Sequence, residues 1–152
     1  QALGIRTVEA LDGLDGFGIE MFLTAEGALL VNEVAPRTHN SGHFTIEACI
    51  TDQFEQHLRA ITGLPLGATD LLMPAAMINL LGAEGHTGRP VIRGLAAALA
   101  VPGASVHIYG KAATRPNRKM GHVTVLDADL EAAREKAERV SRVLEITGED
   151  HP

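Results

Sequence analysis

Cysteine, positive charge and long apolar runs are all scarce in this sequence. Cys49 is the single cysteine, so no internal disulfide can form, and a reducing cytoplasm fits the chain best. Lys and Arg number 13 against 19 Asp and Glu, and the net charge of -6 argues against a broad basic surface for nucleic acid or an anionic membrane. The longest apolar stretches, 73–81 and 95–101, are much shorter than the roughly 20 residues that cross a bilayer.

Apolar residues are nevertheless sufficient for a core. They make up 45% of the 152 residues, a length that accommodates one compact domain or two small lobes. The chain opens at Gln1 without a Met and enters a helical pattern almost at once. We therefore expect it to be part of a larger parent protein.

A β-hairpin is predicted near the amino terminus. Residues 18–24 and 28–34 are two β-prone runs separated by Glu26-Gly27, a pair typical of a tight two-residue turn. Residues 35–42 contain Pro, Asn, Ser and Gly, so they are predicted to form a loop whose polar side chains can face a ligand.

An amphipathic helix is predicted after this loop. Phe54, Leu58 and Ile61 recur at helical spacing, and Asp52 with Glu55 forms the pattern of a capping box. Cys49, in the apolar run before the helix, is interpreted as a buried small residue rather than a nucleophile.

The rest of the chain is predicted to form a second lobe. A boundary is expected at 65–70, and three strands and a final helix follow, at 74–81, 105–109, 122–126 and 129–146. The predicted fold class is α+β, with one domain at 1–70 and a small β-rich lobe ending in a helix at 71–152.

Two glutamates should face one another across the hairpin. In a two-residue turn at Glu26-Gly27, Phe22 opposes Val31 and Glu20 opposes Glu33. Like charges so placed destabilise a sheet, and Mg²⁺ on a nucleotide triphosphate would neutralise them. The alternatives are two solvated glutamates on an edge hairpin, or a register shifted by one residue that separates them.

Two separated motifs resemble one enzyme family. The segment NEVAPRTHNSGHFTIEAC at 32–49, preceded by GIEMF at 18–22 and followed by TDQFEQHLRAITGLPLG at 51–67, resembles the ATP-grasp family. YGK at 109–111 and RPNRKMGHV at 115–123 are similar to the carboxy-terminal signature of one of its branches, the N5-carboxyaminoimidazole ribonucleotide synthases. The fold expected is thus the carboxy-terminal part of an ATP-grasp domain followed by the small lobe.

The resemblance implies a ligase of purine biosynthesis. Such enzymes use ATP and Mg²⁺ to carboxylate 5-aminoimidazole ribonucleotide with bicarbonate, through carboxyphosphate, and their full-length forms are typically homodimers. Glu20 and Glu33 match the family's metal ligands, and Asn32 with Glu33 matches its ATP-contacting pair. Arg37 and His39 match loop positions around the carboxyphosphate and the aminoimidazole, where His39 could position the amine or relay its proton.

A local basic cluster is the second site that the resemblance implies. Lys111, Arg118 and Lys119 match cationic positions near the ribonucleotide phosphate, and Lys111 is included with the catalytic residues. In an acidic chain, three cations around one turn can form an anion site, with Arg118 binding phosphate bidentately. A solvated basic turn is the alternative.

Two features depart from the family pattern. Thr38 stands where a Pro is usual, and the preceding domain and Gly-rich ATP-covering loop of such enzymes are not encoded here. We therefore expect the chain to fold without catalysing by itself, and to need the missing amino-terminal portion as a partner. The alternatives are a non-catalytic fragment or dimerisation lobe, or a related ATP-grasp formyltransferase or carboxylase.

Overall fold

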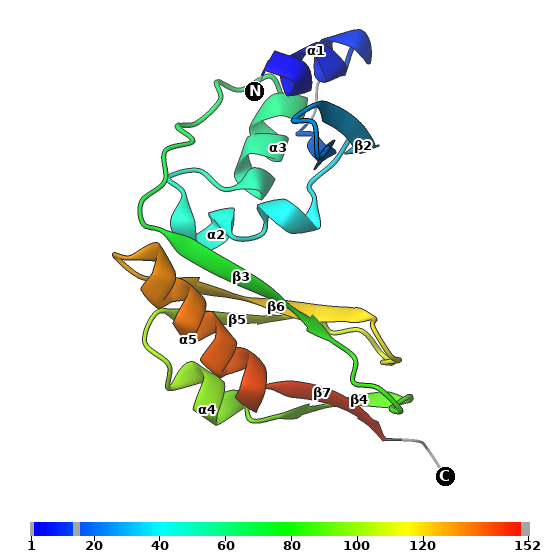
Figure 1. Cartoon of the computed structure of the whole chain (residues 1–152), viewed down its shortest axis with the longest axis vertical. Helices are drawn as coiled ribbons and strands as arrows, with labels where there is room; N and C mark the ends of the chain where they lie inside the picture. Colours follow the sequence, from blue (N-terminus) through cyan, green and yellow to red (C-terminus); the bar gives the residue numbers. More distant parts are fainter. Residues whose placement is uncertain (1, 14–15, 150–152) are drawn as a thin grey trace. The chain divides into compact units, whose positions relative to one another are not determined.

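The computed structural model describes residues 2–13 and 16–149 (Figure 1). The chain divides into two compact units, Gln1–Asp70 and Leu71–Pro152. Both units combine helices with antiparallel strand pairs, which confirms the predicted α+β class. In the part of the chain that is described, no helix has the length and apolar character needed to cross a membrane.

The first unit consists of short helices and one hairpin. Its elements in chain order are helix α1 (Ala2–Ala10), strands β1 (Gly18–Leu23) and β2 (Leu29–Ala35), a 3₁₀ turn (Asn40–Gly42), and helices α2 (Thr45–Ala48) and α3 (Gln53–Ile61). The hairpin was predicted correctly, although β2 begins and ends one residue later than expected.

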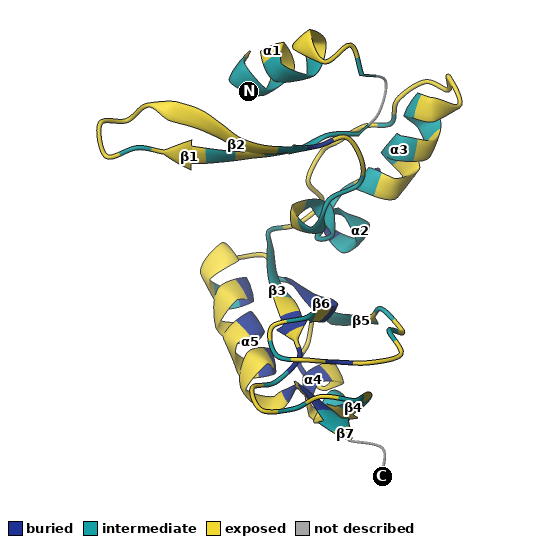
Figure 2. Ribbon diagram, turned by 90° about the vertical axis from the view of Figure 1, so that its right-hand side faces the viewer, coloured by how far each residue is buried: buried dark blue, intermediate teal, exposed yellow. Residues whose placement is uncertain are grey.

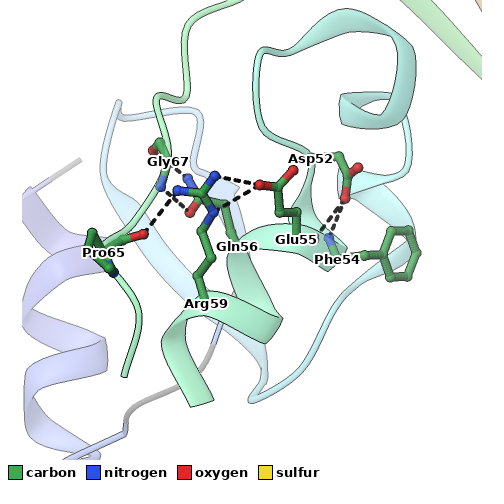
Figure 3. Close-up of polar contacts among 7 residues, drawn as sticks. All are labelled: Asp52, Phe54, Glu55, Gln56, Arg59, Pro65 and Gly67. Carbon is green, nitrogen blue, oxygen red and sulfur yellow. Dashed lines mark hydrogen bonds and ion pairs between the residues drawn. The ribbon is translucent and has the colours of Figure 1, made fainter. Parts of the chain in front are cut away.

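Helix α3 begins at a side-chain cap, as its sequence predicts (Figure 3). Asp52 Oδ1 accepts hydrogen bonds from the backbone N–H groups of Phe54 and Glu55, at 2.7 and 3.0 Å. The Glu55 carboxylate pairs with Arg59, at 2.5 Å to Nη2 and 2.9 Å to Nε. Asp52 therefore supplies the N-cap, while Glu55 supports the first turn through an i, i+4 pair.

Few side chains are buried within the first unit. Among its described residues, those in the buried class are Ala35, Ala48 and Thr51, whereas Phe22 and Leu23 near the hairpin tip are 59% and 71% exposed. Figure 2 shows this exposure along the outer half of the β1–β2 hairpin. Local hydrogen bonds, rather than a large core, therefore define much of this unit's conformation.

The second unit contains two small sheets and two helices. Strands β3 (Ala75–Leu81), β6 (Lys119–Leu126) and β5 (Ala104–Ile108) form an antiparallel sheet in that order. A second sheet pairs β4 (Arg89–Arg93) with β7 (Glu145–Glu149), and the helices are α4 (Leu95–Leu99) and α5 (Leu130–Val143).

The hydrophobic core lies where α5 packs on the three-stranded sheet. Ala133, Ala137 and Val140 form the buried stripe of α5 (Figure 2). This stripe belongs with a core that includes Leu80, Met120, Val123, Val125 and Ile146. Asp129 caps the helix by accepting a hydrogen bond from the Ala132 backbone N–H at 2.9 Å.

Two boundaries predicted for this unit are wrong by three residues. The final helix ends at Val143 rather than at Ile146, because Ile146 is buried in β7 and pairs with Ile92 of β4. Strand β6 begins at Lys119, three residues before the predicted start. Its early part includes Gly121, where a Cβ would lie 2.2 Å from the His107 carbonyl oxygen. Glycine therefore permits close strand pairing, but it weakens the residue pattern by which a strand is predicted from the sequence.

Three elements of this unit were not predicted, namely β4, α4 and β7, whose first two residues were assigned to the final helix. Strand β4 contains Pro90, which lowers the apparent strand propensity although an edge strand tolerates it. Helix α4 has five residues and follows Gly94, whose φ of 75° is left-handed. Its apolar composition gave no period long enough to identify a helix.

Gly94 provides a test of close packing between β4 and the end of α5. A Cβ at Gly94 would lie 1.7 Å from the Val143 carbonyl oxygen, whereas Gly85, with the same φ of 75°, has no heavy atom within 4 Å of that position. We expect Gly85→Ala to lower the free energy of unfolding by about 1 kcal/mol from its backbone conformation. Gly94→Ala should lower it by at least about 3 kcal/mol, because the clash is with backbone.

Urea denaturation at 25 °C, followed by circular dichroism, measures both variants. Because the two glycines have the same φ, Gly85→Ala is a matched control for the strain of a left-handed residue. Equal losses in the two variants would contradict the packing assigned to Gly94.

Candidate functional site

Two carboxylates lie directly opposite each other in the first unit. Glu20 on β1 pairs with Glu33 on β2 in the antiparallel ladder, as predicted from the sequence. Opposed side chains in such a ladder have Cβ atoms about 4.5–5.5 Å apart and share one face of the sheet. Both residues are solvent-exposed, so a cation could reach the pair.

The route to this pairing differs from the predicted two-residue turn. Thr24 N donates to Ala28 O at 2.9 Å, so the loop has three residues, and Gly27 adopts the left-handed φ of 84° that such loops require. Phe22 consequently pairs with Leu30, and the predicted pairing with Val31 is wrong. A register shift after Glu20 then restores the alignment of the two glutamates.

Asn32 is the extra residue at this register shift. It lies between Val31, which pairs with Met21, and Glu33, which pairs with Glu20. A bulge of this kind redirects side chains, and Asn32 Nδ2 lies 3.4 Å from Glu20 Oε2. The amide therefore lies beside the two carboxylates, so Glu20, Asn32 and Glu33 come together at one place.

His39 adds an imidazole to this cluster. Its Nε2 lies 3.6 Å from Glu20 Oε1, and its side chain is 14% exposed. Ser41 N donates to His39 Nδ1 at 3.3 Å, which makes Nδ1 an acceptor and assigns the ring proton of the neutral form to Nε2. Gly18 permits this packing, because a Cβ there would lie 2.5 Å from His39 Cβ.

Arg37 lies on the same loop, beside a pocket of about 380 Å³. Its Nη1 donates to Thr38 O at 3.1 Å, and Arg37, His39 and Cys49 all contribute to the pocket lining. The structure therefore brings Glu20, Asn32, Glu33 and His39 together, whereas Arg37 is related to them through the pocket lining that it shares with His39.

The predicted basic residues come together in the second unit. Lys111 Nζ donates to Lys119 O at 2.5 Å and lies 5.7 Å from the centroid of the Tyr109 ring. Arg118 Nη1 donates to Ala113 O at 2.7 Å. These bonds fold the segment between β5 and β6 back on itself, so that Lys111, Arg118 and Lys119 arise from one turn, together with Arg115.

The turn is also tied to the end of β3. Asn117 has a left-handed φ of 62°, and its Nδ2 donates to Glu84 Oε1 at 3.0 Å. Gly82 N donates to Arg118 O at 2.9 Å, and a Cβ at Gly82 would lie 2.2 Å from Arg115 O. The cationic residues are therefore presented by a tightly constrained backbone.

A histidine and tyrosine cluster was missed by sequence reasoning. His122, 2% exposed, stacks on His107 of the neighbouring strand at 4.4 Å between ring centroids. The Tyr109 hydroxyl lies 2.9 Å from His122 Nδ1, and burial raises the pKa of Tyr109. The available signal was that His107 and Tyr109 alternate on one face of a predicted strand.

The carboxylates of Glu20 and Glu33 suit a hard cation that takes its remaining ligands from phosphate and water. Within the described residues, no three His, Cys, Asp or Glu side chains cluster as a complete metal-binding set. Mg²⁺ commonly takes one or two protein carboxylates and fills its octahedral shell with phosphate oxygens and water. Glu20 and Glu33 fit that requirement.

Comparison with known proteins identifies the class. Residues 1–54 match the model of the ATP-grasp domain, and residues 75–136 match that of the phosphoribosylaminoimidazole carboxylase C-terminal domain. The sequence is 49% identical over 135 residues to the phosphoribosylaminoimidazole carboxylase of Ogataea methanolica, an alignment that covers 86% of this chain and 24% of the relative. The hairpin with its paired glutamates thus lies in an ATP-grasp domain.

Solved structures identify the branch of the ATP-grasp family to which the chain belongs. The N5-carboxyaminoimidazole ribonucleotide synthetase of Thermotoga maritima is 60% identical with a TM-score of 0.92, over 97% of this chain and 41% of that one. The Aspergillus clavatus synthase, solved with ADP and 5-aminoimidazole ribonucleotide, is 37% identical with a TM-score of 0.82, over 93% of this chain and 38% of that one. The chain belongs to the N5-carboxyaminoimidazole ribonucleotide synthase family and corresponds to the carboxy-terminal portion of its members.

Cys49 is half-buried rather than fully buried as predicted, and it lines the pocket with Arg37 and His39. Burial raises the pKa of its thiol, the opposite of the shift that activates a nucleophilic cysteine. At a given pH near neutrality, the folded chain should therefore contain less thiolate than the unfolded chain. We expect iodoacetamide to alkylate the folded protein more slowly, with the rate profile displaced to higher pH.

The measurement compares alkylation rates between pH 7 and pH 10 in buffer and in denaturing urea. Cys49 is the single cysteine, so each rate reports one site. A folded-state midpoint at or below that of the unfolded chain would contradict the assignment.

Proposed function

We propose that this chain is the carboxy-terminal part of a ligase of purine biosynthesis. The enzyme would convert 5-aminoimidazole ribonucleotide, bicarbonate and ATP to N5-carboxyaminoimidazole ribonucleotide, ADP and phosphate. The observation that carries the proposal is the convergence of Glu20, Asn32, Glu33 and His39 at the β1–β2 hairpin. The chain spans 24% of the length of its Ogataea methanolica relative, which supports the proposal that an amino-terminal portion of the same enzyme would be its partner.

Residues 1–70 would contribute the metal and nucleotide side of the ATP site. Glu20 and Glu33 would hold Mg²⁺, and Asn32 with Glu33 would contact ATP. When held by these residues, Mg²⁺ would supply charge that neutralises phosphate oxygens and polarises the γ-phosphoryl group. The bulge supports this assignment, because it places a neutral amide beside two carboxylates, where it can contact nucleotide oxygens without adding charge.

Arg37 and His39 would act on the carboxyl group and the amine. Bicarbonate oxygen attacks the γ-phosphorus of ATP to give carboxyphosphate and ADP, and negative charge spreads over phosphoryl and carboxyl oxygens. The permanently charged Arg37 is suited to stabilise that charge. Attack by the exocyclic amine of the ribonucleotide on the carboxyl carbon then releases phosphate and a proton, and His39 orients the amine or accepts the proton.

Residues 71–152 would contribute an anion site for the ribonucleotide. Lys111, Arg118 and Lys119 arise from one turn with a constrained backbone, which supports their assignment to the substrate phosphate. Lys111 would also serve catalysis by fixing the ribonucleotide in place. The Aspergillus clavatus relative was solved with 5-aminoimidazole ribonucleotide, and its structural likeness extends over 93% of this chain.

The parent enzyme is expected to work in the cytoplasm as a homodimer. The lone thiol of Cys49 fits a reducing compartment. The alternative of a non-catalytic or dimerisation lobe is less well supported, because such a role does not require two like charges opposed beside an amide and an imidazole.

Glu33→Gln tests the metal assignment and the proposed reaction together. In the full-length enzyme that contains this chain, the substitution should lower kcat by roughly 10²-fold or more, because it removes charge stabilisation at the phosphoryl group. The assay is phosphate release from ATP that depends on both bicarbonate and 5-aminoimidazole ribonucleotide, measured across Mg²⁺ concentrations.

Glu26→Gln is the matched control on the same hairpin. Glu26 lies in the loop, where its own backbone N–H and Thr24 lower its pKa, and it takes no part in the carboxylate pair. Its substitution should leave kcat within about twofold. Near-normal activity of Glu33→Gln at ordinary Mg²⁺ would rule out the metal assignment.

Arg118→Ala tests the anion site of the second unit. The KM for 5-aminoimidazole ribonucleotide should rise by about tenfold or more, while the KM for ATP changes little, because a charge-assisted phosphate contact contributes roughly 1.5–3 kcal/mol. Arg118→Lys should recover part of the loss, since it retains charge without bidentate geometry.

Arg142→Ala is the control for loss of a surface arginine. Arg142 pairs with Glu138 on α5 and its side chain is 72% exposed, so little change in either KM is expected. If Arg118→Ala raises both KM values equally and also lowers the melting temperature, the turn has a structural role and the phosphate assignment is wrong.

A further inference from the structure

Gln53, the first residue of α3, contacts the loop that carries His39. Gln53 Oε1 accepts a hydrogen bond from the His39 backbone N–H at 2.8 Å. Gln53 Nε2 lies 2.8 Å from His43 Nδ1 at the other end of the same loop. One side chain therefore joins two histidines that are four residues apart.

These partners determine how the Gln53 amide is oriented. The His39 backbone N–H can act only as a donor, so the side-chain atom facing it must be the carbonyl oxygen. The Gln53 NH₂ group then faces His43, whose Nδ1 must accept. His43 therefore carries the proton of its neutral ring on Nε2.

The loop is closed around Gln53 by two further features. Gly42 leaves space for the side chain, because a Cβ there would lie 2.5 Å from Gln53 Oε1. The Gln53 backbone N–H donates to Thr45 Oγ1 at 3.0 Å, and that hydroxyl donates to Gly42 O at 2.6 Å. The main chain and the side chain of Gln53 thus both fix the loop.

The position of the His39 ring depends on this main-chain contact. Ser41 N binds His39 Nδ1 at 3.3 Å, and Nε2 lies 3.6 Å from Glu20 Oε1. If the His39 backbone shifts, the ring moves relative to the carboxylate pair. A displacement of about 1 Å of a reacting group can lower a rate by roughly 10²-fold.

We propose that Gln53 is a positioning residue, which holds His39 through its backbone N–H so that Nε2 faces the carboxylate site. The effect on catalysis rests on the proposed function, whereas the structural effect on His39 does not. Gln53 itself is not expected to touch ATP or the metal. Its loss should therefore affect turnover more than nucleotide affinity.

Gln56 provides a matched control on the same helix. It is also a glutamine, and its side chain binds the backbone of Gly67 twice, with Nε2 to O at 2.7 Å and Oε1 to N at 3.0 Å (Figure 3). Gln56→Leu therefore removes two hydrogen bonds of a glutamine side chain, as Gln53→Leu does. The two bonds lost in Gln56→Leu do not involve His39. The two variants should lose similar stability.

Kinetics of the full-length enzyme form the first arm of the test. Gln53→Leu should lower kcat by at least about tenfold with little change in the KM for ATP. Gln53→Glu keeps the acceptor for the His39 N–H and should recover kcat to within a few-fold, and Gln56→Leu should leave it within about twofold. Equal kcat values for Gln53→Leu and Gln56→Leu, or equal losses in Gln53→Leu and Gln53→Glu, would overturn the proposal.

NMR of the 152-residue chain forms the second arm and needs no activity. The His39 amide should exchange slowly in the wild type and in Gln53→Glu, and faster in Gln53→Leu. The ring ¹⁵N shifts of His43 should move toward a protonated Nδ1 in Gln53→Glu, since a carboxylate accepts where the amide donated. Unchanged His39 exchange in Gln53→Leu would overturn the proposal even if the enzyme has a different substrate.

Discussion

The opposition of two like charges across a short hairpin is the constraint on which the rest of the site depends. Glu20 and Glu33 can approach each other only if the backbone holds them in place, since electrostatic repulsion favours their separation. Asn32 and His39 both lie next to Glu20, so the same constraint sets their positions. A cation bound between the two carboxylates would offset this repulsion.

Support for this cluster comes mainly from local contacts. The first unit buries few side chains, and its loop is defined by short-range partners such as Gln53, Ser41 and Gly18. The second unit differs, because α5 covers its central sheet. The turn that carries Lys111 and Arg118 is hydrogen-bonded to the residue after β3, a strand that contributes Leu80 to the core. Each unit therefore presents its functional residues in its own way, one by a network of hydrogen bonds and the other by a packed sheet.

Patterns with a clear local cause were predictable from the sequence. Alternating β-prone runs around Glu26-Gly27 gave the hairpin, Asp52 gave the start of α3, and apolar periodicity gave most of α5. The motifs also identified the family correctly, since two separated segments agreed on one branch. The opposition of Glu20 and Glu33 was correct as well, although two compensating errors in the turn and the bulge lay behind it.

Features set by tertiary pairing were not predictable in the same way. Ile146 continues the apolar pattern of α5, yet pairing with Ile92 draws it into a strand. Gly121 and Pro90 have low strand propensity, which weakens the sequence pattern of their segments. These segments form strands nevertheless, because a partner strand lies beside each of them. The stacking of His107 on His122 required knowledge of which residues oppose each other on β5 and β6. The contact of Gln53 with His39 depends on a loop conformation with no periodic pattern.

The three-residue loop and the bulge at Asn32 differ in how they constrain changes of this hairpin in evolution. Deletion of one loop residue can leave the pairing of Thr24 with Ala28, and every pair beyond it, unchanged, because a two-residue loop also closes a hairpin. Deletion of Asn32 would likewise leave Glu20 opposite Glu33, since Met21 would still pair with Val31, but it would remove the amide that lies beside Glu20. Length changes should therefore be tolerated at the tip of the hairpin and selected against at Asn32.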